Sequence, residues 1–402
     1  MQVSAIVKEK AQQQEQYYHE KYYSIFEAAI EYLKKQDVYM YGGTALDQYM
    51  PAKYKIYDKY QLPDIDVFST NPVRLSNGLV AILSKSGLKS SKQEAFHNGT
   101  ISVFCEGLKV ADVSHMSQEY LRRFSSSSGL RGDMGIKLIS MDFIRFTLHA
   151  MLATSSSQRW EKVVKRLESV YTVFPLMKPD WAKHTVRVTD YARDVMAVNE
   201  AIHVLTEGSK DQNTILLGTP IVAMMVGKVI NAIHNVPYNI LIVSGSVSAY
   251  ANTIVKSFPE AHLTVEKCDD APDYLFQPPH VAIRYGNVIV ALIFQASSKC
   301  FSYNDVQGRN VGTIHTMLMF YFSMYLSIDP HFVRMRPSLL CIINALSAVC
   351  KQTISNKPSK TLLNHLSLKC MGYEEGLATL RRNHFKPANK PTHKHRPRPH
   401  LV

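Results

Sequence analysis

The N-terminal third of the chain alternates between two hydrophobic patterns, one with helical spacing and one with the period of two typical of strands. Residues 1–37 end in FEAAIEYLKK, where apolar side chains recur at intervals of three and four. Shorter apolar runs, bounded by turn-forming residues, predict strands. In chain order we expect a helix, a short strand, a turn, a second strand, a helix and a hairpin over residues 1–37, 39–41, 42–44, 62–69, 74–87 and 101–114. This order is typical of a mixed α/β domain.

A similar series of patterns returns later in the chain. The prolines of PLMKPDW at 175–181 mark a domain boundary, because proline disfavours a continuing helix. A strand, a turn at Gly245-Ser246 and a helix follow, and the turn is the expected counterpart of the one at 42–44. The remaining predictions are helices over 141–171, interrupted by a serine tract at 155–157, a hairpin over 280–294 that turns at Gly286-Asn287, and helices from 313 to 382. This repetition of elements has two explanations. The fold is duplicated and its second copy lacks paired acids, or two sets of common α/β elements are similar by coincidence.

Composition places the chain among globular proteins and points to a polyanionic partner. Of its 402 residues 46% are hydrophobic and 20% are charged, and the formal net charge is +13. Seven Lys or Arg and no acid lie between Arg381 and Val402, so over half of the excess sits in a tail. We predict that residues 386–402 are a disordered basic arm that binds the polyanionic partner, and that deleting them weakens this binding.

The cysteines and the apolar runs bear on the cellular compartment. The six cysteines show no C-x-x-C spacing, which argues against a zinc module or a disulfide framework and for a reduced, intracellular setting. The N-terminus lacks the apolar stretch of a secretory signal. The apolar runs around 215–227 and 317–328 are shorter than the roughly 20 residues of a membrane-spanning helix. We therefore expect buried helices there and no membrane partner.

Two acids lie one residue apart in the apolar run LPDIDVFS. Side chains alternate along a strand, so Asp64 and Asp66 project from the same face. Two like charges held close together are costly unless a cation neutralises them, and carboxylate oxygens are the ligands that Mg²⁺ prefers. This pair therefore predicts a metal site.

Two further features accompany this acid pair. The turn Gly42-Gly43-Thr44 precedes a helix and predicts a phosphate-binding site, with backbone amides and the Thr44 hydroxyl as donors. Asp112, a charged residue in the apolar strand LKVADVS, supplies a third carboxylate. Three carboxylates can hold two ions, Mg²⁺ or Mn²⁺, at the reacting phosphate. Each feature alone has a bland explanation: a turn, a surface strand, or an ion pair of Asp112 with Arg122 or Arg123.

Taken in this order, these residues resemble a known family. The Gly-Gly-Thr turn, the D-x-D strand and the later Asp are similar to the polymerase-β-like nucleotidyltransferase superfamily, and YGGTALDQYMP…IYDKYQLPDIDVFS resembles the poly(A) polymerase catalytic subunits of poxviruses and other large DNA viruses. RWEKVVKRL, CFSYNDVQGRNVGTIHTMLMFYFSMYL and KCMGYEEGLATLRRNH extend the resemblance to residues 35–385. It implies an enzyme that adds AMP from ATP to the 3′ end of mRNA and releases pyrophosphate.

The resemblance also implies an α/β (α+β) fold in which a catalytic domain is followed by a degenerate copy and a helical C-terminal region. The expected parts are a helical segment at 1–37, a catalytic nucleotidyltransferase domain at 38–178, a degenerate copy at 179–385 and the tail at 386–402. An N-terminal domain that poxvirus members carry is not seen, so a heterodimer with their methyltransferase processivity subunit is less expected than a homodimer. The implied location is the cytoplasmic viral factory, with packaging in the virion as a further option.

A basic helix provides candidate contacts to RNA or triphosphate. Its four cations, at helical spacings of three and four, are Arg159, Lys162, Lys165 and Arg166. An amphipathic surface helix would show the same pattern, and we expect Trp160 to pack in the core.

Three alternatives to a poly(A) polymerase remain at this point. One is a toxin-like nucleotidyltransferase that modifies tRNA or protein, and another is a non-catalytic RNA-binding subunit. The third is a SAM-dependent methyltransferase in the second half, where residues 240–269 have the outline of a strand, a glycine turn, a helix and a second strand.

Overall fold

The architecture comes from a computed structural model of the whole chain. It describes residues 2–354 and 366–372, apart from gaps at 86, 96–98, 126–128, 155–158, 186–189, 209–213, 231, 269–271, 273–274, 276 and 297–299. The serine tract at 155–157 and the basic tail lie outside the described residues, so their predictions stay predictions.

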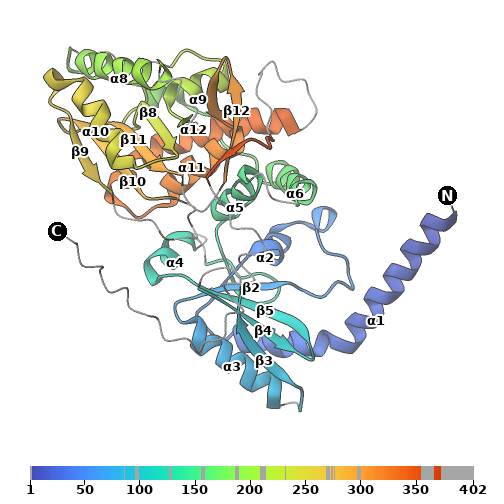
Figure 1. Cartoon of the computed structure of the whole chain (residues 1–402). Helices are drawn as coiled ribbons and strands as arrows, with labels where there is room; N and C mark the ends of the chain where they lie inside the picture. Colours follow the sequence, from blue (N-terminus) through green and yellow to red (C-terminus); the bar gives the residue numbers. More distant parts are fainter. Residues whose placement is uncertain are drawn as a thin grey trace, which may run out of the picture.

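The first sheet has six strands in the order β3-β4-β5-β2-β1-β6. In Figure 1 it fills the lower lobe, in blue and cyan, with α3 against one side of it and α1 projecting outward. The strands are β1 (Tyr39–Tyr41), β2 (Ile65–Ser69), β3 (Ser90–Glu94), β4 (Thr100–Cys105), β5 (Leu108–His115) and β6 (Lys137–Leu138). The helices are α1 (Gln2–Leu33), α2 (Gly42–Tyr49), the 3₁₀ turn η1 (Ala52–Tyr54), α3 (Pro72–Lys85) and α4 (Gln118–Phe124).

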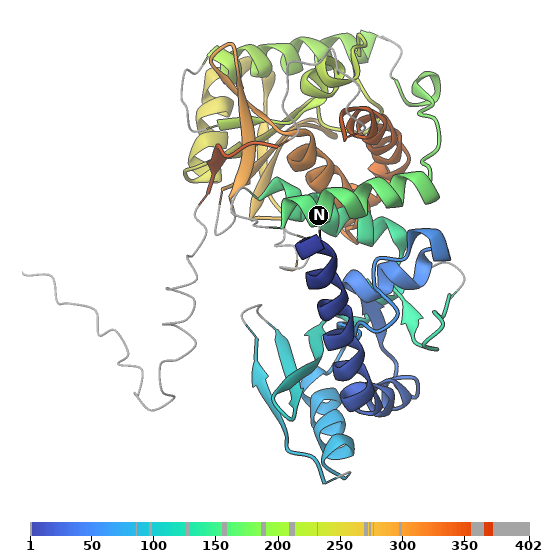
Figure 2. The same cartoon turned by 90° about the vertical axis from the view of Figure 1, so that its right-hand side faces the viewer.

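The second sheet has eight strands in the order β14-β12-β13-β7-β8-β11-β10-β9. Its strands are β7 (Thr214–Leu216), β8 (Asn239–Val243), β9 (Thr264–Lys267), β10 (His280–Tyr285), β11 (Val288–Gln295), β12 (Phe301–Val306), β13 (Arg309–Gly312) and β14 (Cys370–Met371). The helices from the first lobe onward are α5 (Met141–Ala153), α6 (Trp160–Val173), α7 (Trp181–His184), α8 (Asp190–Gly208), α9 (Thr219–Val226), α10 (Val247–Ser257), the 3₁₀ turn η2 (Pro259–Ala261), α11 (Ile314–Leu326) and α12 (Pro330–Ile354). Figure 2 shows α5 and α6 between the two lobes.

The two sheets share one topology. In the first, β1 is antiparallel to β2, β2 is parallel to β5, and β5, β4 and β3 follow in antiparallel order. In the second, β7, β8, β11, β10 and β9 repeat these relations in the same sequence. The similarity extends to one further strand on the other side of β1 and of β7: β6 is parallel to β1, and β13 is parallel to β7. The α/β fold with a second copy of the first sheet is therefore confirmed in the arrangement of strands.

The topology corrects the expected alignment of the copies. The strand at 239–243 is the counterpart of β2, not of β1, because it pairs in parallel with β11 as β2 does with β5. The counterpart of the first glycine turn is therefore Gly218-Thr219, between β7 and α9, rather than Gly245-Ser246. Since β9 is an antiparallel edge strand, the parallel β-α-β unit of the methyltransferase alternative is also excluded.

Most predicted elements are confirmed, and the misses have a physical reason. The second hairpin turns where expected, at Gly286, and the first turns at Glu106-Gly107; all three residues have positive φ. The edge strand β3 was missed because its sequence SSKQE has no apolar alternation and is almost wholly exposed. Continuous helix from 313 to 382 is wrong, since Cys370 and Met371 form β14 against β12.

Helices α11 and α12 form much of the core of the second lobe. All but one residue of α11 is buried, as predicted for the apolar run at 317–328. Helix α12 is long and apolar enough to cross a membrane, but 61% of its most apolar window is buried inside the protein. That burial is typical of the core helix of a globular domain.

Two cysteines depart from the expectation that the chain has no disulfide framework. Cys300 and Cys370 form a disulfide between chain positions 70 residues apart. Cys370 is in β14 and Cys300 directly precedes β12, and the pairing of these strands brings the two cysteines together. A search for short C-x-x-C spacings could not have found a pair so distant in sequence.

Candidate active site

Three carboxylates converge at neighbouring strands of the first sheet. In the parallel pairing of β2 with β5, Asp66 lies directly opposite Asp112. Asp64 stands just before β2, two residues from Asp66, so both project from one face of the strand. The structure thus brings together the three acids that the sequence singled out.

The electrostatics of this group favour a bound cation. Burial, together with the charges of Asp64 and Asp112, raises the pKa of Asp66 to about 8. A carboxyl group with so high a pKa is costly to ionise near neutral pH unless a positive charge compensates. The group offers oxygen ligands only, and its negative charge is not fully neutralised. Mg²⁺ and Mn²⁺ prefer such sites. The residues present therefore fit a divalent metal site.

Lys109 is a site residue that the sequence analysis missed. Its Nζ lies 2.8 Å from Asp112 Oδ2 and 3.4 Å from Asp64 Oδ1, while Ser102 Oγ donates to Asp112 Oδ1 at 2.5 Å. Three residues along a regular strand would put Lys109 and Asp112 on opposite faces. A register shift in the β4–β5 pairing, beside Phe104, brings them to the same face. Among the described contacts, Asp112 pairs with Lys109 and not with Arg122 or Arg123.

The glycine turn lies against these acids. Helix α2 begins at Gly42, which has φ +72°, a left-handed conformation that favours glycine. A side chain at Gly42 would overlap the Asp66 carboxylate, and one at Gly43 would overlap the Tyr57 hydroxyl and come within 3.0 Å of Arg166 Nη2. The N-terminus of α2, a positive end of the helix dipole, therefore faces both the metal site and a guanidinium.

Thr44 links the glycine turn to the acid pair. It is 1% exposed, and its hydroxyl donates to the carbonyl oxygen of Asp64 at 2.6 Å. This bond ties α2 to the start of β2, so the Thr44 side chain holds the D-x-D segment in position. The expected donation of the Thr44 hydroxyl to a phosphate oxygen stays a prediction.

Helix α6 turns some of its four cations toward the site. Lys162 has its pKa lowered by Arg166, then by burial and by Arg159, while Asp64 acts in the opposite direction. These influences place three of the cations in one electrostatic neighbourhood near the carboxylates. Lys165 is separate: it is exposed and pairs with Glu161 at 2.6 Å. The apolar face packs inward as expected, and the Trp160 indole donates to the carbonyl of Thr154 at 3.2 Å while packing on the core.

A second group of potential metal ligands lies deep between the lobes. One ligand atom from each of His149, His315 and Cys350 falls within 4.8 Å of the other two, and all three residues are buried. His149 Nδ1 hydrogen-bonds His315 Nδ1 at 2.9 Å, and its Nε2 hydrogen-bonds the Tyr171 hydroxyl at 2.6 Å. Tyr171 in turn donates to Ser347 Oγ at 3.0 Å. This chain of hydrogen bonds accounts for both ring nitrogens of His149 without a metal.

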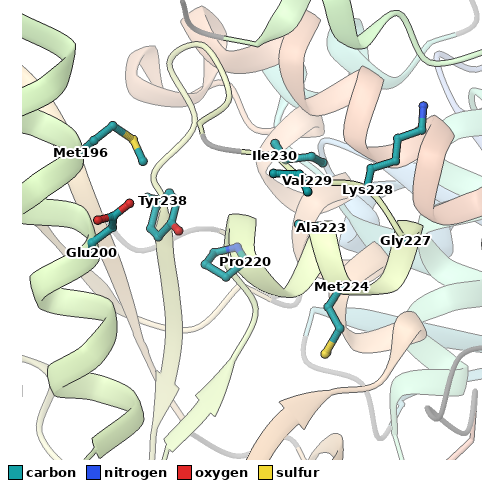
Figure 3. A pocket seen from close by; sticks show the side chains of 10 residues that line it. All are labelled: Met196, Glu200, Pro220, Ala223, Met224, Gly227, Lys228, Val229, Ile230 and Tyr238. Atoms are coloured by element: carbon teal, nitrogen blue, oxygen red, sulfur yellow. The ribbon is translucent and has the colours of Figure 1, made fainter. Parts of the chain in front are cut away.

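A pocket of about 530 Å³ lies in the second lobe, between α8 and α9, and none of the three candidate acids lines it. Figure 3 shows Met196 and Glu200 of α8 facing Tyr238 and Pro220, with Met224 on the far side. The pocket has one carboxylate among its lining residues, so it offers no paired acids for metal-assisted transfer.

The second sheet has no acids at the positions that match the three candidate acids of the first sheet. Tyr41 pairs with Asp66 across β1 and β2, and Leu216 pairs with Leu241 across β7 and β8. Leu241 in turn pairs with Ile293, as Asp66 pairs with Asp112. The counterparts of Asp64, Asp66 and Asp112 are therefore Asn239, Leu241 and Ile293. Among the described residues, the three candidate acids therefore lie together in the first copy alone.

Comparison with known proteins agrees with this geometry. The model of the family described as poly(A) polymerase catalytic subunit matches residues 27–158. A protein of Acanthamoeba polyphaga mimivirus, named "Putative poly(A) polymerase catalytic subunit", is 29% identical over 168 residues, which are 38% of this chain and 27% of that protein. A protein of the same name from African swine fever virus (strain Badajoz 1971 Vero-adapted) is 30% identical over 125 residues, 31% of this chain and 26% of that protein. The matched region thus spans about a quarter of each relative's length.

The structural likeness extends over nearly the whole chain. The crystal structure of the Megavirus polyadenylate synthase superposes with a TM-score of 0.77 and 18% sequence identity, covering 95% of this chain and 81% of the other. At that identity the likeness establishes the fold. The resemblance inferred from the motifs is confirmed: residues 27–158 match the model of the poly(A) polymerase catalytic subunit family, and the fold is similar to that of a viral polyadenylate synthase.

Proposed function

We propose that this chain is a template-independent poly(A) polymerase that adds AMP from ATP to the 3′ end of mRNA and releases pyrophosphate. The observation that carries the proposal is the direct pairing of Asp66 with Asp112, with Asp64 and the glycine turn beside them. Nucleotidyl transfer needs little more from a protein than this: carboxylates for metal, and backbone donors for phosphate.

In the proposed reaction the RNA 3′-hydroxyl oxygen forms a bond to the α-phosphorus of ATP. The bond from that phosphorus to the oxygen bridging to the β-phosphate breaks, pyrophosphate leaves, and the hydroxyl proton passes to a site carboxylate or to water. Two Mg²⁺ or Mn²⁺ ions held by Asp64, Asp66 and Asp112 would supply the positive charge that this displacement requires. Arg166 and the N-terminus of α2 hold the triphosphate in line.

A direct assay tests this function. Purified protein is incubated with a short RNA and each nucleoside triphosphate separately, with Mg²⁺ or Mn²⁺. We expect 3′ extension with ATP that is lost in Asp64→Ala and Asp66→Ala and kept in Glu94→Ala, a matched change of an exposed acid on the same sheet. Extension that survives both site substitutions contradicts the assignment of the site. Equal use of all four nucleotides would keep nucleotidyl transfer and contradict poly(A) synthesis.

We also propose that the active form is a homodimer, an expectation that rests on the resemblance of the sequence to viral relatives. Sedimentation equilibrium of the full chain measures its mass in solution. A monomer mass at concentrations where the enzyme is active would rule the dimer out.

A further inference from the structure

The loop that joins α2 to β2 carries aromatic rings and cations in alternation. Its sequence from residue 53 to 60 is KYKIYDKY, with tyrosines at every third position. Lys53 Nζ lies 5.4 Å from the centre of the Tyr54 ring, and Lys59 Nζ lies 5.1 Å from the centre of the Tyr60 ring. Flat rings combined with cations are the components of surfaces that bind single-stranded nucleic acid, where bases stack and phosphates pair.

The inner end of this loop is fixed at the candidate active site. The buried Asp47 of α2 accepts hydrogen bonds through Oδ1 from the backbone N–H groups of Ile56 at 2.7 Å and Tyr57 at 3.2 Å. The Tyr57 hydroxyl reaches Gly43, and the Arg166 guanidinium lies 5.9 Å from the centre of the Tyr57 ring. A chain that follows the loop inward therefore ends beside the proposed triphosphate and metal sites.

The outer end of the loop continues onto α1. The Tyr60 ring meets the His19 ring edge to face at 5.8 Å, and His19 stacks on Tyr23 at 4.4 Å. In Figure 1 this helix leaves the body of the protein on the side of that loop. Farther along α1, Tyr17 is 59% exposed and Tyr18 is 41% exposed. Aromatic surface thus continues outward from the site over two elements.

We propose that Tyr57, Tyr60, His19 and Tyr23, with Lys53 and Lys59, form a track that binds the 3′-terminal nucleotides of single-stranded RNA. This rests on the proposed function and names the surface that holds its substrate. Bases stack on the rings while the two lysines pair with backbone phosphates. Stacking accepts any base, because every base has a π-face, and this suits an enzyme that must hold both an arriving transcript and the poly(A) that it makes.

Fluorescence anisotropy with a labelled oligoadenylate, without ATP and at several salt concentrations, tests the track. We expect Tyr60→Ala to weaken binding about tenfold and Tyr60→Phe, which keeps the ring, to leave it within about twofold. Lys59→Gln should lower the salt-dependence slope by about one. Tyr250→Ala, on α10 of the second lobe, is the distant control.

The outcomes separate the track from the proposed activity, because binding is measured without catalysis. Loss of affinity in Tyr60→Ala alone, with an unchanged thermal midpoint, supports the track even in a protein that adds no AMP. Unchanged RNA affinity in Tyr60→Ala overturns it, and so does an equal loss in Tyr60→Phe, which would assign the effect to the hydroxyl. Unchanged RNA affinity with altered self-association would show that this surface meets protein instead.

Discussion

The two sheets of this protein share strand order and direction, yet among the described residues only the first brings three carboxylates together. At equivalent positions the first sheet has Asp66 opposite Asp112, and the second has Leu241 opposite Ile293. The first arrangement raises the pKa of Asp66 to about 8 through burial and like charge, whereas Leu241 is 1% exposed in an apolar layer. The same strand arrangement thus holds buried like charges, at a cost in stability, in the first sheet, and apolar residues that stabilise the core in the second.

The largest effect should come from making the first copy resemble the second. Asp66→Leu places the residue of the second copy at the metal site, and we expect at least about a 10³-fold loss in the rate of AMP addition. The fold should survive, because the substitution removes a carboxyl whose ionisation the site opposes. Single-turnover extension and thermal unfolding without metal measure the two effects. Retained activity would contradict the role of Asp66 in the reaction. A lowered unfolding midpoint would contradict the idea that the Asp66 carboxyl destabilises the metal-free fold.

The reverse change should damage stability instead of activity. Leu241→Asp buries a carboxyl with neither Lys109 nor a metal to compensate it, and we expect a loss on the order of 3–5 kcal/mol in the free energy of unfolding. Leu241→Met, which keeps volume and polarity, is the matched control and should cost under about 1.5 kcal/mol. Urea unfolding of the full chain gives both values. A Leu241→Asp protein as stable as its control would mean that the second copy still tolerates charge.

Sequence reasoning reached the first copy well because its signals are local. The three acids, the glycine turn and the β4–β5 hairpin follow from alternation and turn chemistry within short windows. The role of Lys109 depends on a register shift across β4 and β5, and the approach of Arg166 depends on how α6 packs. Such contacts join distant segments, so no periodicity within one segment can reveal them. The same holds for the bond between Cys300 and Cys370.

The raised pKa of Asp66 predicts a pH dependence of metal binding that the second copy cannot show. Below about pH 8 the metal-free site holds a proton that a divalent ion must displace. Apparent Mn²⁺ affinity should therefore rise by up to tenfold per pH unit between about pH 6 and 8 and then level off. In the metal-free protein, titration of Asp66 lowers the free energy of unfolding as the pH rises from about 4 to 8. Over this range the carboxyl is protonated in the folded state and ionised in the unfolded state.

Asp66→Asn is the control for this titration, because its amide keeps the shape and cannot ionise. Calorimetry in two buffers of different ionisation enthalpy counts the protons released with Mn²⁺. We expect close to one released proton at neutral pH in the native protein and a clear decrease in Asp66→Asn. Equal proton release in both proteins would place the titrating group elsewhere.

The smallest predicted effect concerns two neighbouring cations of helix α6, of which only one lies beside the candidate site. Arg166 lies 3.0 Å from where a side chain at Gly43 would begin, while Lys165, one position away, is exposed and bound to Glu161. Arg166→Gln should raise the KM for ATP about tenfold, the cost of one charge-assisted contact to phosphate, with a smaller effect on RNA affinity. Lys165→Gln should leave both within about twofold, because an exposed pair contributes little. Initial rates at varied ATP, with RNA saturating, separate the two residues. Equal effects of both substitutions would show that the helix acts only through its overall charge, and that the arginine has no defined place beside the glycine turn.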